Sequence, residues 1–225
     1  MCTSDTRLSW VLAALAGMVG AAAFLHTTGY FVTFMTGNTE RAVLGYFHHD
    51  QGQAVAAGML LGSFLAGVVA ASWLRRHVWS NHPHNVTVLT TLCLALATLY
   101  DLSAGGWHRD EVLLGPTLLV AFGIGALNTS FVDAKGEVRI PLSYVTGTVV
   151  KLGQAIERHV SGVGPAADWL EYLLLYASFA AGALLGGLLG MVVGGPAMLM
   201  AATVVCLATT VYTRLHEEIY GPLIP

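Results

Sequence analysis

The sequence predicts an all-α polytopic membrane protein with six transmembrane helices, arranged as two inverted three-helix repeats. Three observations predict this fold: a very apolar composition, apolar runs of membrane-spanning length, and a motif that occurs twice. Of the 225 residues, 55% are hydrophobic and only 10% are charged, whereas a soluble domain has about 25% charged residues. The chain therefore has too little polar surface to face water.

The first half, residues 1–111, contains three expected spans, at residues 8–30, 53–74 and 86–102. Each approaches the roughly 20 residues that cross the hydrocarbon core. An amphipathic stretch, residues 31–50, separates the first two. The first span resembles a cleaved signal peptide, but the repeat requires it as its first helix, so we expect it to be retained.

The second half, residues 112–225, repeats this order. We expect spans at residues 112–132, 169–193 and 197–214, with a long polar and amphipathic connection before the second of them. Gly194-Gly195-Pro196 is expected to break the fifth span from the sixth, since proline and glycine interrupt helices.

The recurring motif is a Thr-Gly step followed by a cation. Thr36-Gly37 matches Thr146-Gly147, and Arg41 matches Lys151. We expect each step to begin a helix, because a threonine hydroxyl caps free backbone N–H groups and glycine tolerates the break. The cation would then lie in the first turn, where it opposes the helix dipole, and an anionic partner would explain it.

Three spans in each copy make the second copy inverted relative to the first, as in many secondary transporters. With the N-terminus inside, the outer loops carry only Arg41 and Arg109 of the ten lysines and arginines. The positive-inside rule therefore predicts that both termini are cytoplasmic.

The runs Phe34-Met-Thr-Gly-Asn38 and Pro141-Leu-Ser-Tyr-Val-Thr-Gly-Thr148, with Gly125-Ala-Leu-Asn128 upstream, resemble the YoaK-like family of bacterial membrane proteins, domain of unknown function 1275. The resemblance implies about six helices in the bacterial plasma (inner) membrane and supplies no substrate. Family members often carry an acid where this chain has Gly20. A proton-coupling role for that acid does not carry over.

Two interpretations of the Thr-Gly copies remain open. In one, the helix N-termini point into a cavity and attract anions or polar solutes. In the other, they cap interfacial helices while the cations snorkel to headgroups. The substrate-binding candidates come from the two copies and from polar residues in or beside the spans. They are Thr36, Gly37, Asn38, Arg41, Asn128, Thr146, Gly147, Thr148, Lys151 and His26.

Two of these candidates lie outside the copies. His26, with Thr27 and Thr28, is expected to end the first helix and to line a polar cavity that faces the Thr-Gly turn. Asn128 is expected to hydrogen-bond the facing unwound segment, to touch the solute, or to join two helices.

Stripes of small residues on the second and fifth spans predict close helix packing. Either these two spans cross each other, or the stripes form a homodimer contact. The stripe residues are Gly58, Gly62, Ser63, Gly67, Ser178, Gly182, Gly186 and Gly190.

The sequence contains no HExxH, GxSxG, Walker or CxxC motif, so we expect no enzyme, cofactor or metal site. A net charge of −3 gives no indication that the protein binds nucleic acid. The leading hypothesis is a small secondary transporter or permease for a small polar or anionic solute. The alternative is a membrane scaffold or accessory subunit, favoured because we expect no buried carboxylate for ion coupling.

Overall fold

The computed structural model describes residues 4–27, 29–79, 83–108, 111–133, 135–140 and 142–220. These residues form α-helices, one 3₁₀ turn and an isolated bridge between Val132 and Val138. The elements are α1 (Ser4–His26), α2 (Met35–Phe47), α3 (Gln51–His77), α4 (Pro83–Ser103), η1 (Gly106–His108), α5 (Leu114–Leu127), α6 (Val145–Val160), α7 (Ala166–Gly190) and α8 (Gly195–Tyr220). The prediction of an all-helical polytopic protein is confirmed.

Five of the described helices are long and apolar enough to cross a membrane: α1, α3, α4, α7 and α8. The expected span at residues 112–132 is shorter than predicted, because α5 has only 14 residues and ends at Leu127. The next three side chains, Asn128, Thr129 and Ser130, bond back to carbonyls of the last turn. Such bonds compete with helix continuation. The six-span count therefore stays a prediction.

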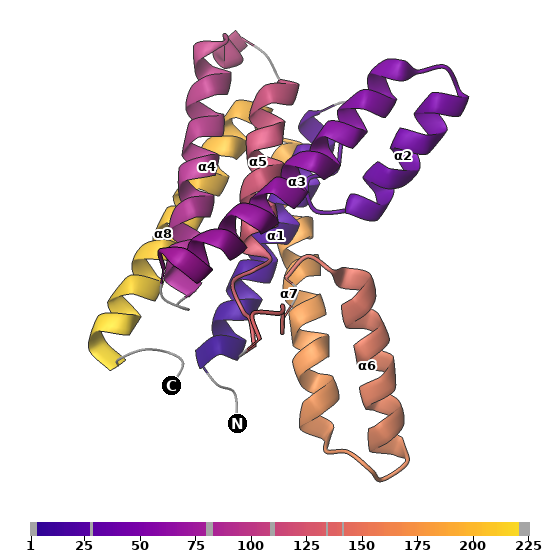
Figure 1. The fold of residues 1–225 in the computed structure, drawn as a ribbon, viewed down its shortest axis with the longest axis vertical. Helices are drawn as coiled ribbons and strands as arrows, with labels where there is room; N and C mark the ends of the chain where they lie inside the picture. The colour runs from indigo at the N-terminus through magenta and orange to yellow at the C-terminus, as the bar shows by residue number, and fades with distance from the viewer. Residues whose placement is uncertain are drawn as a thin grey trace.

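The helices pack in two corresponding sets: α1, α6 and α7 form one, and α2, α3 and α5 form the other (Figure 1). Helix α1 lies along α7, and α3 lies along α5; α2 folds back on α3, and α6 folds back on α7. Helix α4 packs between α5 and α8, and α8 also contacts α1. Each first-half helix thus makes contacts that have counterparts in the second half.

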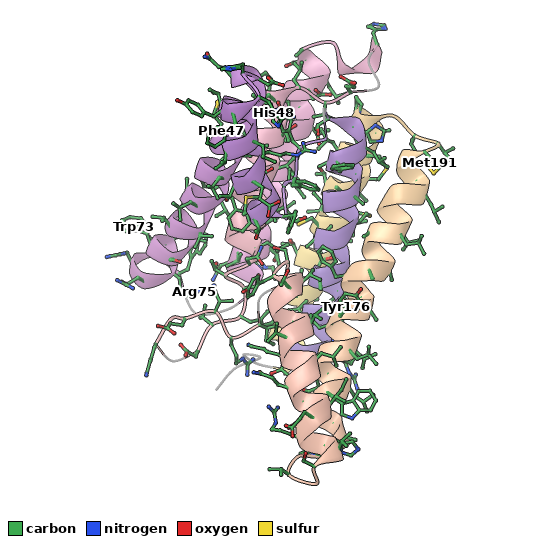
Figure 2. The ribbon with its side chains drawn as sticks, turned by 90° about the vertical axis from the view of Figure 1, so that its right-hand side faces the viewer. Phe47, His48, Trp73, Arg75, Tyr176 and Met191 are labelled. Atoms are coloured by element: carbon green, nitrogen blue, oxygen red, sulfur yellow. The ribbon has the colours of Figure 1, made fainter. Side chains whose placement is uncertain are left out.

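Helices α2 and α3 form one hairpin arm, and α6 and α7 form the other. The two arms point to opposite ends of the molecule in both views. Figure 2 shows Phe47 and His48, at the α2–α3 turn, at its upper end. The α6–α7 turn lies at the lower end, where α1 starts and α8 finishes (Figure 1).

Glycines let α1 and α7 approach each other to backbone contact. A Cβ atom on Gly182 would lie 1.9 Å from the carbonyl oxygen of Ala14, and one on Gly17 would lie 2.1 Å from that of Phe179. Real Cβ atoms do not come this close to another atom. The glycine stripe of α7 therefore packs against α1.

The same arrangement recurs between α3 and α5. A Cβ atom on Gly67 would lie 2.0 Å from the carbonyl oxygen of Phe122, and one on Gly125 would lie 2.1 Å from that of Phe64. The prediction that the second and fifth spans cross each other through their stripes is wrong, because Gly67 of α3 packs on α5 and the glycines of the α7 stripe pack on α1, each the first helix of the other half. The homodimer alternative stays a prediction.

Hydroxyl groups join α4 to α8 inside the bundle, a contact that the sequence analysis missed. The Oγ1 atoms of Thr91 and Thr210 are 2.9 Å apart, and those of Thr98 and Thr203 are 3.0 Å apart. Thr91 also donates to Sγ of Cys206 at 3.2 Å. Hydroxyl bonds of this kind hold membrane helices together.

A buried carboxylate lies at the end of α4, contrary to expectation. Asp101 is fully buried, and its Oδ1 accepts a hydrogen bond of 3.2 Å from the backbone N–H of Leu113. A Cβ atom on Gly106 would lie 2.5 Å from Oδ2, so the chain folds tightly over the acid. Its burial depends on the fold of the connection between α4 and α5, which the sequence did not reveal.

Candidate functional site

A cavity of about 860 Å³ lies between the two sets of helices. The first residues of α2, Met35 and Thr36, line it, and so do the first residues of α6, Val145 and Thr146. Helices α1, α3 and α7 supply other parts of the wall. Both Thr-Gly copies therefore border one cavity, and this volume falls within the range of about 300–1,000 Å³ typical of small-molecule sites.

The wall of the cavity is mainly apolar and aromatic. Its rings belong to Phe24, Phe31, Phe34, Phe64, Tyr144 and Phe179. Its polar side chains, apart from the Tyr144 hydroxyl, are Thr33, Thr36, Asn128, Ser143 and Thr146. No charged side chain is among the described residues that line it. The cavity thus offers a large apolar surface with a few hydroxyl and amide groups.

The Thr-Gly glycines serve a different purpose from the one predicted. Helices α2 and α6 begin one residue before each threonine, with Phe34 and Tyr144 as N-caps that make no side-chain cap bond. A Cβ atom on Gly37 would lie 2.4 Å from the Phe34 ring, and one on Gly147 would lie 2.1 Å from the Tyr144 ring. The prediction of threonine caps is wrong: each glycine makes room for the aromatic ring that precedes it.

Asn38 and Thr148 hold the two helix starts in place. Asn38 is fully buried; its Nδ2 donates to the carbonyl of Phe31 at 2.6 Å, and its Oδ1 accepts from the N–H of Phe31 at 3.4 Å. The hydroxyl of Thr148 donates to the carbonyl of Tyr144 at 3.2 Å. Both side chains therefore bond to the segment that leads into their own helix.

Asn128 is the C-cap of α5 and lines the cavity. Its Oδ1 accepts from the backbone N–H of Ser143 at 2.9 Å and from the Ser143 hydroxyl at 3.1 Å. The expectation that it bonds the facing unwound segment is confirmed. At the corresponding place in the first half, Gly20 faces Thr33, and a Cβ atom there would lie 2.5 Å from Thr33 Oγ1.

The two candidate cations lie in different surroundings. Both are six residues into their helices (41 − 35 and 151 − 145) and so occupy the second turn, not the first. The Arg41 guanidinium lies 5.8 Å from the ring centre of Phe24 and 5.0 Å from that of Phe31, whereas Lys151 is exposed.

His26 and Thr27 lie outside the large cavity. They border a separate space of about 30 Å³ with residues of α5 and α8 such as Thr117 and Met198. The expectation that they face a Thr-Gly turn is wrong for these two residues, and Thr28 lies outside the described residues. Among the residues that the structure describes, no three His, Cys, Asp or Glu side chains gather as a metal site.

Comparison with known proteins agrees with this membrane architecture. A family model described as "Protein of unknown function (DUF1275)" matches residues 8–212. The chain is also similar to UPF0700 transmembrane protein RA0705 of Rhizobium meliloti (strain 1021), with 27% identity over 179 residues, which cover 78% of this chain and 71% of the relative. No solved structure matches. The predicted resemblance is confirmed: the chain belongs to the DUF1275 family of membrane proteins.

Proposed function

We propose that the protein is a small secondary transporter or permease for a small polar or anionic solute. The observation that carries this proposal is the single cavity bordered by the starts of both α2 and α6. Helix N-termini present free N–H groups and a partial positive charge, which favour anions and polar groups. Paired half-helices around a central site are a recurring design in secondary transporters.

We further propose six crossings and two inverted repeats, divided near residue 111. The paired packing of α1 on α7 and of α3 on α5 supports this proposal, as do the opposed directions of the two arms. In this arrangement α5 is the fourth crossing. Its 14 residues span about 21 Å, less than the hydrocarbon core, so the neighbouring connections complete the crossing. Both termini would then lie on the cytoplasmic side of the bacterial plasma membrane.

The moving parts of such a transporter would each combine helices from both halves. Helices α1, α6 and α7 pack together as one group, and α2, α3 and α5 pack together as the other. Glycine contacts make each group tight, while the cavity lies between the groups. Arg75 strengthens the second group, because its guanidinium donates to the carbonyl of Thr129 just after α5. Rocking of one group against the other would expose the cavity alternately to each side.

The test is transport by the purified protein in proteoliposomes. Currents on a solid-supported membrane would be recorded with phosphate, methanesulfonate and benzenesulfonate, with and without a pH or sodium gradient. We expect a current above that of protein-free vesicles for at least one anion. The double variant Thr36→Val, Thr146→Val should reduce it, because it removes a hydroxyl from both helix starts at the cavity wall.

The absence of a current with every anion and gradient would favour the alternative, a membrane scaffold or accessory subunit. The buried carboxylate of Asp101 removes one argument for that alternative. On either proposal the protein is not an enzyme and the lipid bilayer is its surroundings. A homodimer is proposed through Gly58 and Gly62 of α3, where an added Cβ atom would meet nothing within 4 Å.

A further inference from the structure

We propose that the solute of the large cavity carries a planar aromatic ring, and that Phe34 and Tyr144 are the residues that select it. This inference rests on the proposed function and names the class of solute that the cavity would take. It comes from three observations: the corresponding positions of the two residues, the glycine against which each ring lies, and the aromatic wall around them.

Phe34 and Tyr144 occupy the same place in the two copies of the motif. Each is the N-cap of its helix and stands two residues before the threonine of the Thr-Gly step. Both residues line the one large cavity. Each half of the chain therefore brings one aromatic ring to this cavity, at the start of its short helix.

A glycine in the first turn of each helix fixes the position of the ring. A Cβ atom on Gly37 would lie 2.4 Å from the Phe34 ring, and one on Gly147 would lie 2.1 Å from the Tyr144 ring. Each ring therefore lies directly against the helix backbone. Phe31 also meets Phe34 edge to face, with ring centres 5.2 Å apart. A side chain that is already held in place loses little conformational freedom when a solute packs on it.

Both rings nevertheless present much of their surface. Phe34 is 44% exposed and Tyr144 is 61% exposed. Since both residues line the cavity, a solute inside it can lie against them. Stacked or edge-to-face contacts favour an aromatic partner over a saturated partner of similar size by a factor of about three or more.

The rest of the wall suits the same kind of solute. Phe24 of α1, Phe64 of α3 and Phe179 of α7 also line the cavity. A small, fully hydrated ion would lose its water against this surface without replacement, which is costly. A solute with a ring would instead gain from burying apolar surface. Its polar or anionic head then remains for the helix starts of the proposed function.

The test is direct binding of radiolabelled benzenesulfonate to the purified full-length protein in a neutral maltoside detergent. Unlabelled cyclohexanesulfonate and methanesulfonate would serve as competitors, because all three share one head group. The saturated ring has at least as much apolar surface as the aromatic ring, so the hydrophobic effect alone predicts equal or tighter binding of cyclohexanesulfonate. We expect instead that cyclohexanesulfonate competes about threefold or more weakly than benzenesulfonate, and methanesulfonate about tenfold or more weakly.

Removing either ring should remove part of this preference. Phe34→Leu and Tyr144→Leu should each lower the ratio of benzenesulfonate to cyclohexanesulfonate affinity about threefold. Phe47→Leu and Tyr46→Leu are the matched controls and should leave the ratio unchanged. They make the same substitutions at exposed rings near the end of α2 that do not line the cavity.

Moving a ring without removing it gives a second, independent measurement. Gly147→Ala should displace the Tyr144 ring, because the new Cβ atom would lie 2.1 Å from it. Gly153→Ala makes the same change in the same helix, at a place where the Cβ atom meets nothing within 4 Å. We expect only Gly147→Ala to lower the ratio of benzenesulfonate to methanesulfonate affinity. A general loss of structure would weaken the binding of both sulfonates, so the ratio reports the position of the ring.

No saturable binding of benzenesulfonate, or equal or tighter binding of cyclohexanesulfonate to the unaltered protein, would overturn the inference. This comparison needs no variant, so it stays decisive if the variants do not fold. Phe34→Leu and Tyr144→Leu proteins that both keep the full preference would also overturn it. The two proposals fail separately. Ring-selective binding without transport of any anion refutes the transporter alone, and transport of phosphate or methanesulfonate without benzenesulfonate binding refutes the aromatic solute alone.

Discussion

Replacing Gly67 by alanine tests the packing on which the whole arrangement depends. The new Cβ atom would lie 2.0 Å from the carbonyl oxygen of Phe122, whereas ordinary contacts begin at 3.4 Å. Helices α3 and α5 would therefore have to separate by about 1.4 Å (3.4 − 2.0) at this point, an overpacking that costs about 1–3 kcal/mol. Alanine also favours the helix by roughly 1 kcal/mol over glycine, so a control must remove that gain.

Gly62→Ala is that control. It makes the same change in the same helix, at a place where the added Cβ atom meets nothing within 4 Å. Unfolding in mixed micelles, driven by dodecyl sulfate and followed by tryptophan fluorescence, would give both free energies. We expect Gly67→Ala to be about 2 kcal/mol less stable than Gly62→Ala. Equal stability of the two variants would refute the close α3–α5 contact.

Three further predictions concern other contacts. Asn128→Ala removes the acceptor of two hydrogen bonds from the segment before α6 and should lower the free energy of unfolding by about 1–3 kcal/mol in the same assay; no loss would mean that this bond does not order the segment. A double-mutant cycle of Thr91→Val and Thr210→Val should give a coupling of about 0.6 kcal/mol; zero coupling would contradict a direct bond. In a cysteine-free background, His49→Cys and Ser161→Cys, at the turns of the two arms, should react with a membrane-impermeant maleimide from opposite faces of the membrane; labelling from one face would contradict the inverted repeats.

The sequence by itself determined the class of the protein and most helix positions. Long apolar runs are local features, and the hydrophobic effect acts on them wherever they meet a bilayer. Gly194-Gly195-Pro196 separates α7 from α8 as predicted, because proline and glycine act on their own backbone. The recurring Thr-Gly motif correctly located the starts of α2 and α6 to within one residue.

Only the tertiary structure decided which surfaces meet. From the sequence, Gly182 was predicted to contact either the second span or a second copy of the chain, but it packs on α1. The sequence does not distinguish these partners, because a stripe of small residues allows close packing with any helix. The sequence left open whether Arg41 faces an anionic partner or extends to the lipid headgroups; only the structure shows that it lies against the ring of Phe24, 17 residues earlier (41 − 24). Such contacts depend on the path that the connecting segments take between the helices. A local sequence pattern does not encode that path, because many packings bury the same apolar faces equally well.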